Sequence, residues 1–269
     1  MDTLSPEVFD AYRKLLYDRS GITLKKGKES LLTNRLQKRM RQLGMQRYED
    51  YLEVLTSGRD PAELVRFLDN LSTNLTSFFR EKHHFEHLDQ FLRAKAVNGK
   101  SKVRIWSAAC STGEEPYSIA MVAQRFFGNE SQRIKILGTD INTSVLKTAD
   151  AGIYRARDLD KMNPELKLRS FNRMDPDHYS IKKMLREYLL FKRLNLSEPR
   201  LPLKAKQFDA IFCRNVMIYF DRKVRQQLLN EMHRLLKDDG VLYLGHADTV
   251  NDLDHGFLLK GHTIYDKKT

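Results

Sequence analysis

From Val103 onward, short apolar segments alternate with segments of helical period, and this alternation limits the possible folds more than any other feature. The apolar segments, predicted to be strands, are 103–106, 134–138, 208–212 and 241–244. The amphipathic segments between them, predicted to be helices, are 115–127, 143–149 and 222–236. Because strand–helix alternation produces a parallel sheet with helices on both faces, we predict an α/β domain with a doubly wound sheet.

The residues before this region are predicted to form a separate, small all-α domain. Apolar residues recur with a helical period between Pro6 and Ser20. Three further helices are expected, at 30–43, 48–55 and 61–72. We place the domain boundary after residue 82, so that residues 1–82 form the helical domain and residues 83–269 form the α/β domain.

Residues 172–194 interrupt the strand–helix alternation and are predicted to form a small antiparallel insertion. Ser180–Met184 and Tyr188–Leu194 both show the alternation expected of hairpin strands. Only residues 185–187 separate these segments, so the loop between them is expected to be short.

Composition excludes several classes of protein. Of the 269 residues, 41% are hydrophobic and 30% are charged, which argues against a long disordered chain. No apolar run approaches the roughly 20 residues needed to span a bilayer, and the first residues lack the pattern of a secretory signal. The two cysteines, Cys110 and Cys213, cannot form a disulfide framework. We therefore expect a reduced, cytoplasmic protein.

The positive charge of the chain predicts an acidic partner. Lys and Arg number 47 against 35 Asp and Glu, a formal net charge of +12. Nucleic acid, anionic lipid and an acidic protein surface would all be attracted.

The stretch from Arg19 to Arg47 has nine basic residues and one acid. Within it, Arg35, Lys38 and Arg39 share one face of a predicted helix, and we expect them to bind the substrate. The alternative is a merely solvated face.

A loop of small residues, Ser107–Gly113, follows the first strand of the α/β domain and leads to Glu114 and Glu115 at the start of a helix. Small side chains let a ligand approach the backbone, and open α/β sheets bind ligands at the carboxyl ends of their strands. The loop lacks the G-x-G-x-x-G pattern, and the two acids would repel a pyrophosphate. They favour a ligand with a positive charge, unless they only cap the helix.

Asp140, at the end of the second strand, completes this predicted ligand site. A carboxylate at this position of an α/β sheet accepts hydrogen bonds from ribose hydroxyls. Together with the small-residue loop, Asp140 indicates an adenosine-containing ligand. S-adenosylmethionine fits because it has no pyrophosphate.

Polar residues also follow the third strand, where Arg214 and Asn215 come directly after the apolar run and Tyr219 follows a few residues later. Adenine amino-methyltransferases have an Asp/Asn-Pro-Pro-Tyr/Phe sequence at this place. The prolines are missing here, which weighs against methylation of a base. Tyr219 has the alternative of simple packing in the core.

The segment Asn74–Arg80 is rich in amides and hydroxyls around Phe78 and Phe79. This composition is unlike that of a simple linker and predicts a segment that packs against another part of the structure or a ligand. The planar guanidinium of Arg80 matches a carboxylate; its alternative is an ordinary salt bridge with Glu81 or a helix acid.

His83 and His87 have the i, i+4 spacing of a zinc site, and His84 lies between them. No third ligand is evident nearby in the sequence, so we predict no metal site.

Three segments, Asn74–Arg80, Trp106–Ser118 and Phe212–Phe220, together resemble the CheR family, the chemotaxis receptor glutamate O-methyltransferases. The resemblance spans nearly the whole chain. It implies a helical domain followed by a Rossmann-like methyltransferase sheet, which binds S-adenosylmethionine and releases S-adenosylhomocysteine. By matching positions, it implies a set of cofactor-binding residues: Asn74, Thr76, Arg80, Glu115, Asp140, Asn195, Leu196, Arg214 and Asn215. It also implies that Arg80 and Tyr219 lie nearest the transferred methyl group.

The resemblance further implies methyl transfer to glutamate side chains on the cytoplasmic helices of methyl-accepting chemoreceptors, which forms methyl esters in chemotaxis adaptation. A monomer that neither binds nucleic acid nor inserts into a membrane is expected. The alternatives are an RNA or DNA methyltransferase and a catalytically silent adaptor that binds receptors. The chain departs from the family at Gly245–Asp248, where Gly-His-Ser-Glu is common and a shorter acid stands here. Its loop at 185–187 also looks short beside relatives whose insertion binds a receptor peptide.

Overall fold

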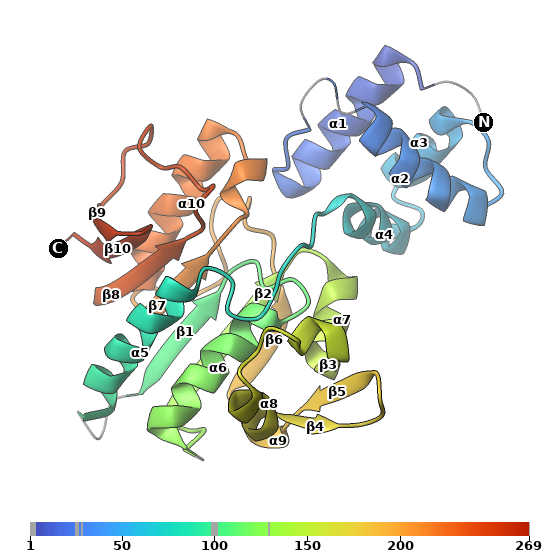
Figure 1. The fold of residues 1–269 in the computed structure, drawn as a ribbon. Coiled ribbons are helices and arrows are strands. Elements are labelled where there is room, and N and C mark those ends of the chain that lie inside the picture. Colours follow the sequence, from blue (N-terminus) through green and yellow to red (C-terminus); the bar gives the residue numbers. More distant parts are fainter. Residues whose placement is uncertain (1–3, 25–26, 28, 98–101, 129, 269) are drawn as a thin grey trace.

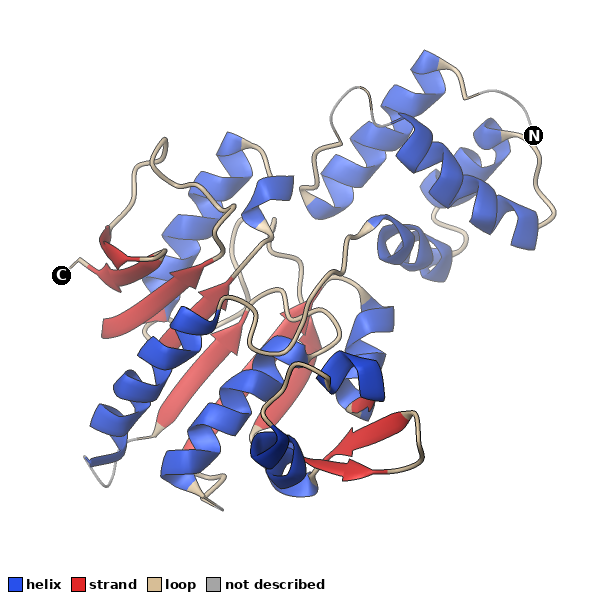
Figure 2. Ribbon diagram, viewed as in Figure 1, coloured by secondary structure: helices blue, strands red, loops and turns tan. Residues whose placement is uncertain are grey.

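The computed structural model describes the chain except residues 1–3, 25–26, 28, 98–101, 129 and 269. It has a helical part at the N-terminal end and an α/β part that contains the sheet (Figures 1 and 2). The four predicted helices of the helical part are confirmed with small shifts at their ends. They are α1 (Pro6–Ser20), α2 (Glu29–Gln42), α3 (Tyr48–Thr56) and α4 (Pro61–Leu71).

Local caps explain where the helices of the N-terminal part begin. The Ser5 hydroxyl accepts a hydrogen bond from the backbone N–H of Val8 at the start of α1. The Asp60 carboxylate does the same for Glu63 at the start of α4, and a proline occupies the first turn of both helices. The helices bury one aromatic and aliphatic core between them. This core gives the helical part a packed interior of its own.

The main sheet has seven strands in the order β6-β2-β1-β7-β8-β10-β9. The strands are β1 (Val103–Ser107), β2 (Ile134–Asp140), β6 (Leu189–Arg193), β7 (Phe208–Cys213), β8 (Leu236–Leu244), β9 (Phe257–Gly261) and β10 (Ile264–Lys267). The first five are parallel to one another, whereas β10 pairs antiparallel with β8 and forms an antiparallel hairpin with β9 at the edge. Because β1 lies between β2 and β7, the polar residues at the ends of these three strands meet at one edge of the sheet.

Helices cover both faces of the main sheet, as the predicted doubly wound fold requires. The helices packed around it are α5 (Lys82–Val97), α6 (Glu114–Phe127), α7 (Thr143–Ala151) and α10 (Arg222–Leu235). One core joins α5 and α6 to one face, through side chains such as Leu88 and Ile105. A second core joins α10 to the other face, through side chains such as Leu228 and Trp106. The two cores fix the sheet between its helical layers (Figure 1).

The antiparallel insertion exists, but its predicted strand pairing is wrong. A separate three-stranded sheet, in the order β3-β5-β4, is formed by β3 (Ile153–Arg155), β4 (Phe171–Arg173) and β5 (His178–Ile181). It therefore begins before residue 172, and η1 (Ala156–Leu159) and α8 (Pro164–Ser170) connect β3 to β4. Residues 183–186 form the short helix α9 (Lys183–Arg186), and β6 joins β2 in the main sheet. An edge strand with one exposed face has the same alternation as a hairpin strand, which explains the error.

Hydrogen bonds between the helical part and the α/β part position the ends of α1 and α4. The Asp69 carboxylate of α4 accepts bonds from the backbone N–H groups of Thr143 and Ser144, at 2.8 and 3.2 Å, and from both of their hydroxyls, at 2.8 Å each. Near the end of α1, the Tyr17 hydroxyl donates to Asp221 at 2.8 Å, and the Thr23 backbone N–H donates to the Tyr219 carbonyl. The two parts thus meet over the edge of the sheet where β1, β2 and β7 end.

In the part of the chain that the structure describes, each helix is too short or too polar to cross a membrane.

Replacement of Asp69 by alanine is predicted to loosen this junction. The variant loses four hydrogen bonds to a charged acceptor and a negative charge at the N-terminus of α7, so the free energy of unfolding should fall by about 1–3 kcal/mol. Urea denaturation followed by circular dichroism measures this change. Asp160→Ala, which removes an exposed acid elsewhere, is the control and should change stability by less than about 0.5 kcal/mol. Equal stability of Asp69→Ala and wild type would contradict the prediction.

Candidate functional site

A pocket of about 950 Å³, partly open to solvent, lies where the helical part meets the carboxyl ends of β1, β2 and β7. All of the residues that the sequence assigned to the cofactor line it, and so does Tyr219. These residues are Asn74, Thr76, Arg80, Glu115, Asp140, Asn195, Leu196, Arg214 and Asn215. Ser20, Ile22 and Leu71 from the helical part complete the wall, so the pocket requires both parts of the chain.

Asp140 is held at the end of β2 by backbone donors. One carboxylate oxygen accepts the N–H of Ser111 at 2.9 Å, and the other accepts the N–H of Asn142 at 2.9 Å. Burial raises the pKa of this carboxyl, and the backbone N–H bonds oppose the rise. Each oxygen has a second lone pair, so the fixed carboxylate can still accept two hydroxyl donors.

A buried charge network lies beside Asp140. The Arg214 guanidinium donates to the Glu115 carboxylate at 2.9 Å, lies 3.2 Å from a Glu81 oxygen, and donates to the backbone carbonyl of Arg80. The Ser107 hydroxyl donates to the other oxygen of Glu115 at 2.7 Å. Burial raises the pKa of Glu115 although Arg214 opposes it. Burial also disfavours the ionised form of Glu81. There, however, Arg214 and other hydrogen-bond donors outweigh burial, so the pKa of Glu81 is lowered.

The backbone is strained at several residues around the pocket. Phe79, Glu81, Ser111 and Asn215 have φ values of 54°, 56°, 47° and 57°, in the left-handed region that non-glycine residues rarely adopt. Hydrogen bonds hold two of them in place: Ser111 donates to Asp140, and Asn215 donates to Asp248. Strain of this kind persists only where the surrounding structure enforces it, and it concentrates at functional sites.

Asp248 positions the loop that follows β7, and sequence analysis did not assign it to the site. Its buried carboxylate accepts the backbone N–H groups of Asn215, of Gly245 at 3.0 Å and of Ile218 at 3.3 Å. A Cβ atom on Gly245 would lie 2.5 Å from the Asn215 side chain, so glycine is required there. The sequence contained one indication of this role, because the segment Gly245–Asp248 after β8 ends in an acidic residue.

Arg80 and Tyr219 face the same pocket from opposite segments of the chain. Arg80 lies in residues 72–81, the linker between α4 and α5. One of its N–H groups donates to the Leu75 carbonyl at 3.0 Å. Tyr219 ends the short helix η2 (Met217–Tyr219) after β7. Both side chains are partly buried. Both side chains can offer hydrogen-bond donors to a group bound in the pocket.

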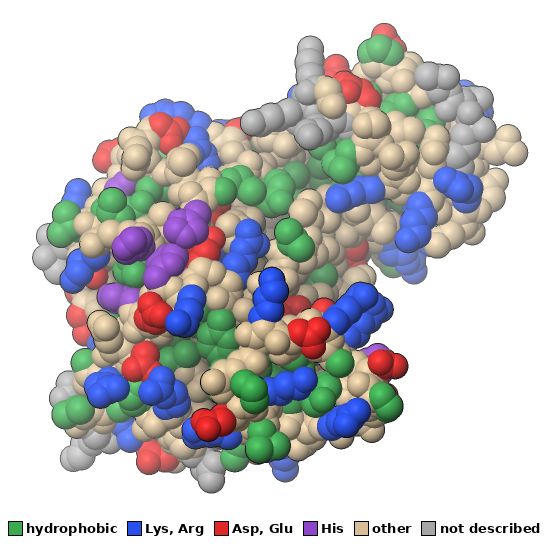
Figure 3. Space-filling view, in the orientation of Figure 1, with side chains coloured by type: hydrophobic (Ala, Val, Ile, Leu, Met, Phe, Trp, Pro, Cys, Tyr) green, Lys and Arg blue, Asp and Glu red, His purple; other side chains and the backbone are tan. Residues whose placement is uncertain are grey.

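The three basic residues predicted to bind substrate lie on α2, away from the pocket lining. Arg39 donates to both oxygens of the buried Glu63, at 2.8 and 2.6 Å, and Arg35 donates to the Leu71 carbonyl at 2.5 Å. Both therefore stabilise the helical part itself. Lys38 and Arg41 are exposed, and Figure 3 shows Lys and Arg side chains over this part of the surface. Other members of the basic stretch, Lys25, Lys26 and Lys28, lie outside the described residues.

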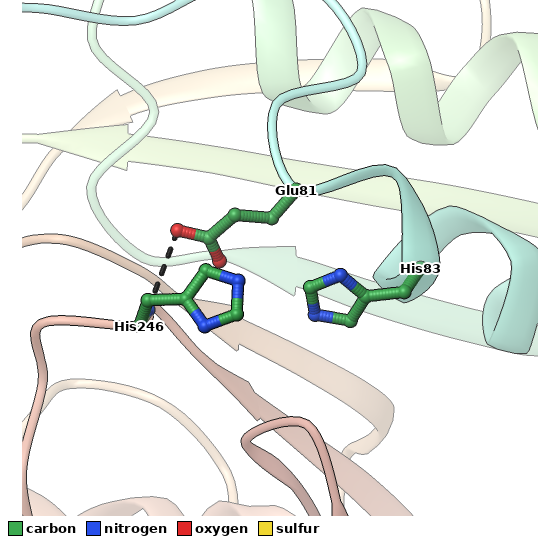
Figure 4. Close-up of side chains that lie close together, drawn as sticks. All are labelled: Glu81, His83 and His246. Carbon is green, nitrogen blue, oxygen red and sulfur yellow. Dashed lines mark hydrogen bonds between the residues drawn. The ribbon is translucent and has the colours of Figure 1, made fainter.

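The histidines near the start of α5 have partners that the sequence did not reveal. Ring nitrogen Nδ1 of His87 lies 2.8 Å from the Tyr243 hydroxyl, and buried His84 contacts the carbonyl of His262 at 3.0 Å. His83 lies near His246, which comes from the loop after β8, and near Glu81 (Figure 4). The structure therefore groups His83 with Glu81 and His246, and not with His87, whose Nδ1 lies against Tyr243.

Comparisons with known proteins agree with this arrangement. Residues 7–72 match the family model of the CheR methyltransferase all-alpha domain, and residues 74–265 match that of the CheR methyltransferase SAM binding domain. The chain is 41% identical to the chemotaxis protein methyltransferase of Escherichia coli (strain K12) over 265 residues, which is 97% of this chain and 91% of that protein. It is 38% identical to the chemotaxis protein methyltransferase of Borreliella burgdorferi over 244 residues, 88% of this chain and 86% of that protein.

Asp248 is predicted to make stability depend on pH. Burial raises its pKa from 3.8 to about 6, so the stability associated with this group is full below pH 3.8 and is lost as the pH rises through 6. The loss is roughly 3 kcal/mol, at about 1.4 kcal/mol per pKa unit. Asp248→Asn cannot titrate there, so the stability of wild type minus that of the variant should fall by that amount between pH 4 and pH 7. Urea denaturation across this range tests it, and a constant difference would contradict the prediction.

Proposed function

Because the chain belongs to the CheR methyltransferase family, and its α/β part is that family's S-adenosylmethionine-binding domain, we propose that it methylates glutamate side chains of chemoreceptor signalling helices. The product would be a glutamate methyl ester formed in chemotaxis adaptation. The observation that carries this proposal is the pocket itself. Its lining includes a fixed carboxylate, Asp140, together with Arg80 and Tyr219.

The residues of the pocket fit S-adenosylmethionine. Asp140 has lone pairs for the two ribose hydroxyls, and the small-residue loop at Ser107–Gly113 allows close approach to the backbone. Acidic side chains on the wall, including Glu115, suit a ligand that carries positive charge. When bound, S-adenosylmethionine supplies a methyl group already activated by its sulfonium.

The proposed nucleophile needs no catalytic base. A glutamate side chain has a pKa of about 4.3 and is ionised at neutral pH. The tasks left to the protein are to orient the substrate carboxylate and to exclude water from it. The pocket walls and the linker over them would perform the second task.

Arg80 and Tyr219 are proposed to orient the substrate carboxylate. Arg80 has five N–H donors, of which one bonds to the Leu75 carbonyl, so the planar guanidinium retains donors for a carboxylate oxygen. If Arg80 contacts one oxygen of the substrate carboxylate, the other oxygen remains free to attack the methyl group. A bidentate contact to both oxygens would reduce the nucleophilicity of the carboxylate. The Tyr219 hydroxyl would fix the direction of the carboxylate through a hydrogen bond.

The exposed charges of α2 are proposed to bind the acidic face of the receptor helix. Lys38 and Arg41 project into solvent one helical turn apart, so an acidic helix can approach both. Arg35 and Arg39 would support this surface and contribute to its potential, while they remain bonded within the helical part. Long-range attraction of this kind raises the association rate more than it strengthens the final complex.

Alkali-labile methyl incorporation separates the proposed function from its alternatives. The purified chain, radiolabelled S-adenosylmethionine and chemoreceptor signalling fragments should produce label that is released as methanol in mild alkali, because methyl esters hydrolyse there. A nucleic-acid methyltransferase would give alkali-stable label on RNA or DNA, and an adaptor would incorporate none. Receptor fragments with Gln in place of the accepting Glu are the control. Alkali-stable label or no label would overturn the proposal.

Tyr219→Phe and Arg80→Lys test the orienting roles. Each variant is predicted to slow single-turnover methyl transfer at saturating cofactor, because it removes a contact made mainly in the transition state. Tyr219→Phe should leave the affinity for S-adenosylhomocysteine within about twofold of wild type. Arg80→Lys should recover little of the rate lost in Arg80→Ala, since an ammonium cannot copy the planar guanidinium.

The pH dependence distinguishes orientation from base catalysis. Measured from pH 6 to 9, the single-turnover rates of wild type and Tyr219→Phe should be parallel. Equal rates in the two proteins would exclude the hydroxyl from catalysis. A slope near one in wild type that disappears in the variant would identify Tyr219 as a titrating base.

Charge reversal on α2 tests the docking surface. Lys38→Glu combined with Arg41→Glu should raise the KM for the receptor, leave kcat unchanged and flatten the salt dependence of kcat/KM. Arg104→Glu combined with Lys204→Glu, an exposed pair of the same composition on the α/β part, is the control and should leave the receptor KM within about twofold of wild type. A loss of cofactor affinity in the α2 variant, or equal effects in the two variants, would argue against this surface.

A further inference from the structure

Three potential metal ligands converge near the start of α5, outside the pocket lining. Glu81 and His83 come from the segment that enters α5, and His246 comes from the loop after β8 (Figure 4). One ligand atom from each residue lies within 4.8 Å of the other two. The segments that supply them are far apart in the sequence, so the folded chain alone creates this group.

Buried polar atoms with unmet bonding capacity gather at the same place. Within the described residues, Nε2 of His83 and Nδ1 of His84 are buried and have no hydrogen-bond partner. Glu81 Oε2 is also buried, and its polar neighbour is the guanidinium of Arg214 at 3.2 Å. Leaving a buried polar group unpaired costs roughly 1–3 kcal/mol, and several such groups at one place indicate a missing ligand.

The tautomer of His84 adds one more electron-pair donor to this group. Its Nε2 lies 3.0 Å from the carbonyl oxygen of His262, which can only accept, so Nε2 carries the proton. In the neutral ring, Nδ1 then carries a lone pair and lies 3.5 Å from Glu81 Oε2. Two electron-pair donors are thus close together with no hydrogen between them.

We propose that Glu81, His83 and His246 bind a divalent transition-metal ion, with Zn²⁺ as the best match. Two imidazoles and one carboxylate are a common ligand set for Zn²⁺, which leaves a fourth position to water, whereas Mg²⁺ and Ca²⁺ prefer oxygen ligands alone.

The geometry can close around the ion by a small adjustment. Ligand atoms around tetrahedral Zn²⁺ at about 2.0–2.1 Å are roughly 3.3 Å apart, which is less than the 4.8 Å limit within which these atoms lie. His246 is exposed and can rotate toward the other two. His84, whose Nε2 is bonded to a carbonyl, lies directly beside His83, with the ring centroids 4.2 Å apart.

The site shares Glu81 with the charge network of the pocket, but it contributes no group to methyl transfer. Glu81 bonds weakly to the side chain of Asn215, at 3.4 Å, and pairs with Arg214. The metal would therefore lie one side chain away from the cofactor site and would fix the segment between the linker and α5. This structural role is separate from the proposed function and can be tested without it.

Calorimetric titration of Zn²⁺ into the full chain, without a polyhistidine tag and after treatment with EDTA, tests the proposal. Wild type should bind one equivalent saturably, His246→Ala should bind at least tenfold more weakly, and His83→Ala should do the same. His178→Ala is the matched control, because it removes a partly exposed imidazole that contacts a carboxylate, Asp175, at a different place. Its affinity should stay within about twofold of wild type.

Binding of Co²⁺ provides a second, spectroscopic measurement that is independent of the calorimetric signal. Bound at the proposed site, it should give a visible absorption band that His246→Ala lacks and His178→Ala retains. Failure of wild type to bind Zn²⁺ saturably, or equal affinity of wild type and His246→Ala, would overturn the proposal.

Discussion

The buried guanidinium of Arg214 connects the segments on which the pocket depends. It pairs with Glu115 at the start of α6 and with Glu81 before α5, and it donates to the backbone carbonyl of Arg80. Removing one partner from a buried ion pair typically costs about 3–5 kcal/mol, because the remaining charge is left uncompensated. The linker that includes Arg80 is therefore held at the end of β7 by electrostatics, although it has little regular structure of its own.

The site is built at some cost in stability. Backbone strain at Ser111 and Asn215, and the raised pKa values of Asp140 and Asp248, all work against folding at neutral pH. The sheet offsets this cost because its two faces are packed against separate cores. A rigid sheet with a strained edge is a physical way to present fixed hydrogen-bond acceptors to a ligand while the fold remains stable.

Much of the fold, and the part of the pocket at the strand ends, could be predicted from the sequence because they follow local rules. Hydrophobic period identified α1–α4, α6, α7 and α10 and the strands β1, β2, β7 and β8, but not α5, β9 or β10. The polar residues after β1, β2 and β7 meet because parallel strands end at one edge, whereas Asn195 and Leu196 were named only through the family resemblance. The position of β6 could not be predicted this way, since alternation does not specify the partner strand. The inward bonds of Arg35 and Arg39, the role of Asp248 and the approach of His246 to His83 depend on contacts between distant segments, which no local pattern encodes.

The most direct test concerns Arg214 itself. If this guanidinium holds the linker over the cofactor pocket, Arg214→Met should bind S-adenosylhomocysteine at least 100-fold more weakly than wild type by calorimetry, while its circular dichroism spectrum stays native. Arg104→Met, which removes an exposed guanidinium from β1, should bind within about twofold of wild type. Affinity near that of wild type in a folded Arg214→Met protein would show that the pocket forms without this network.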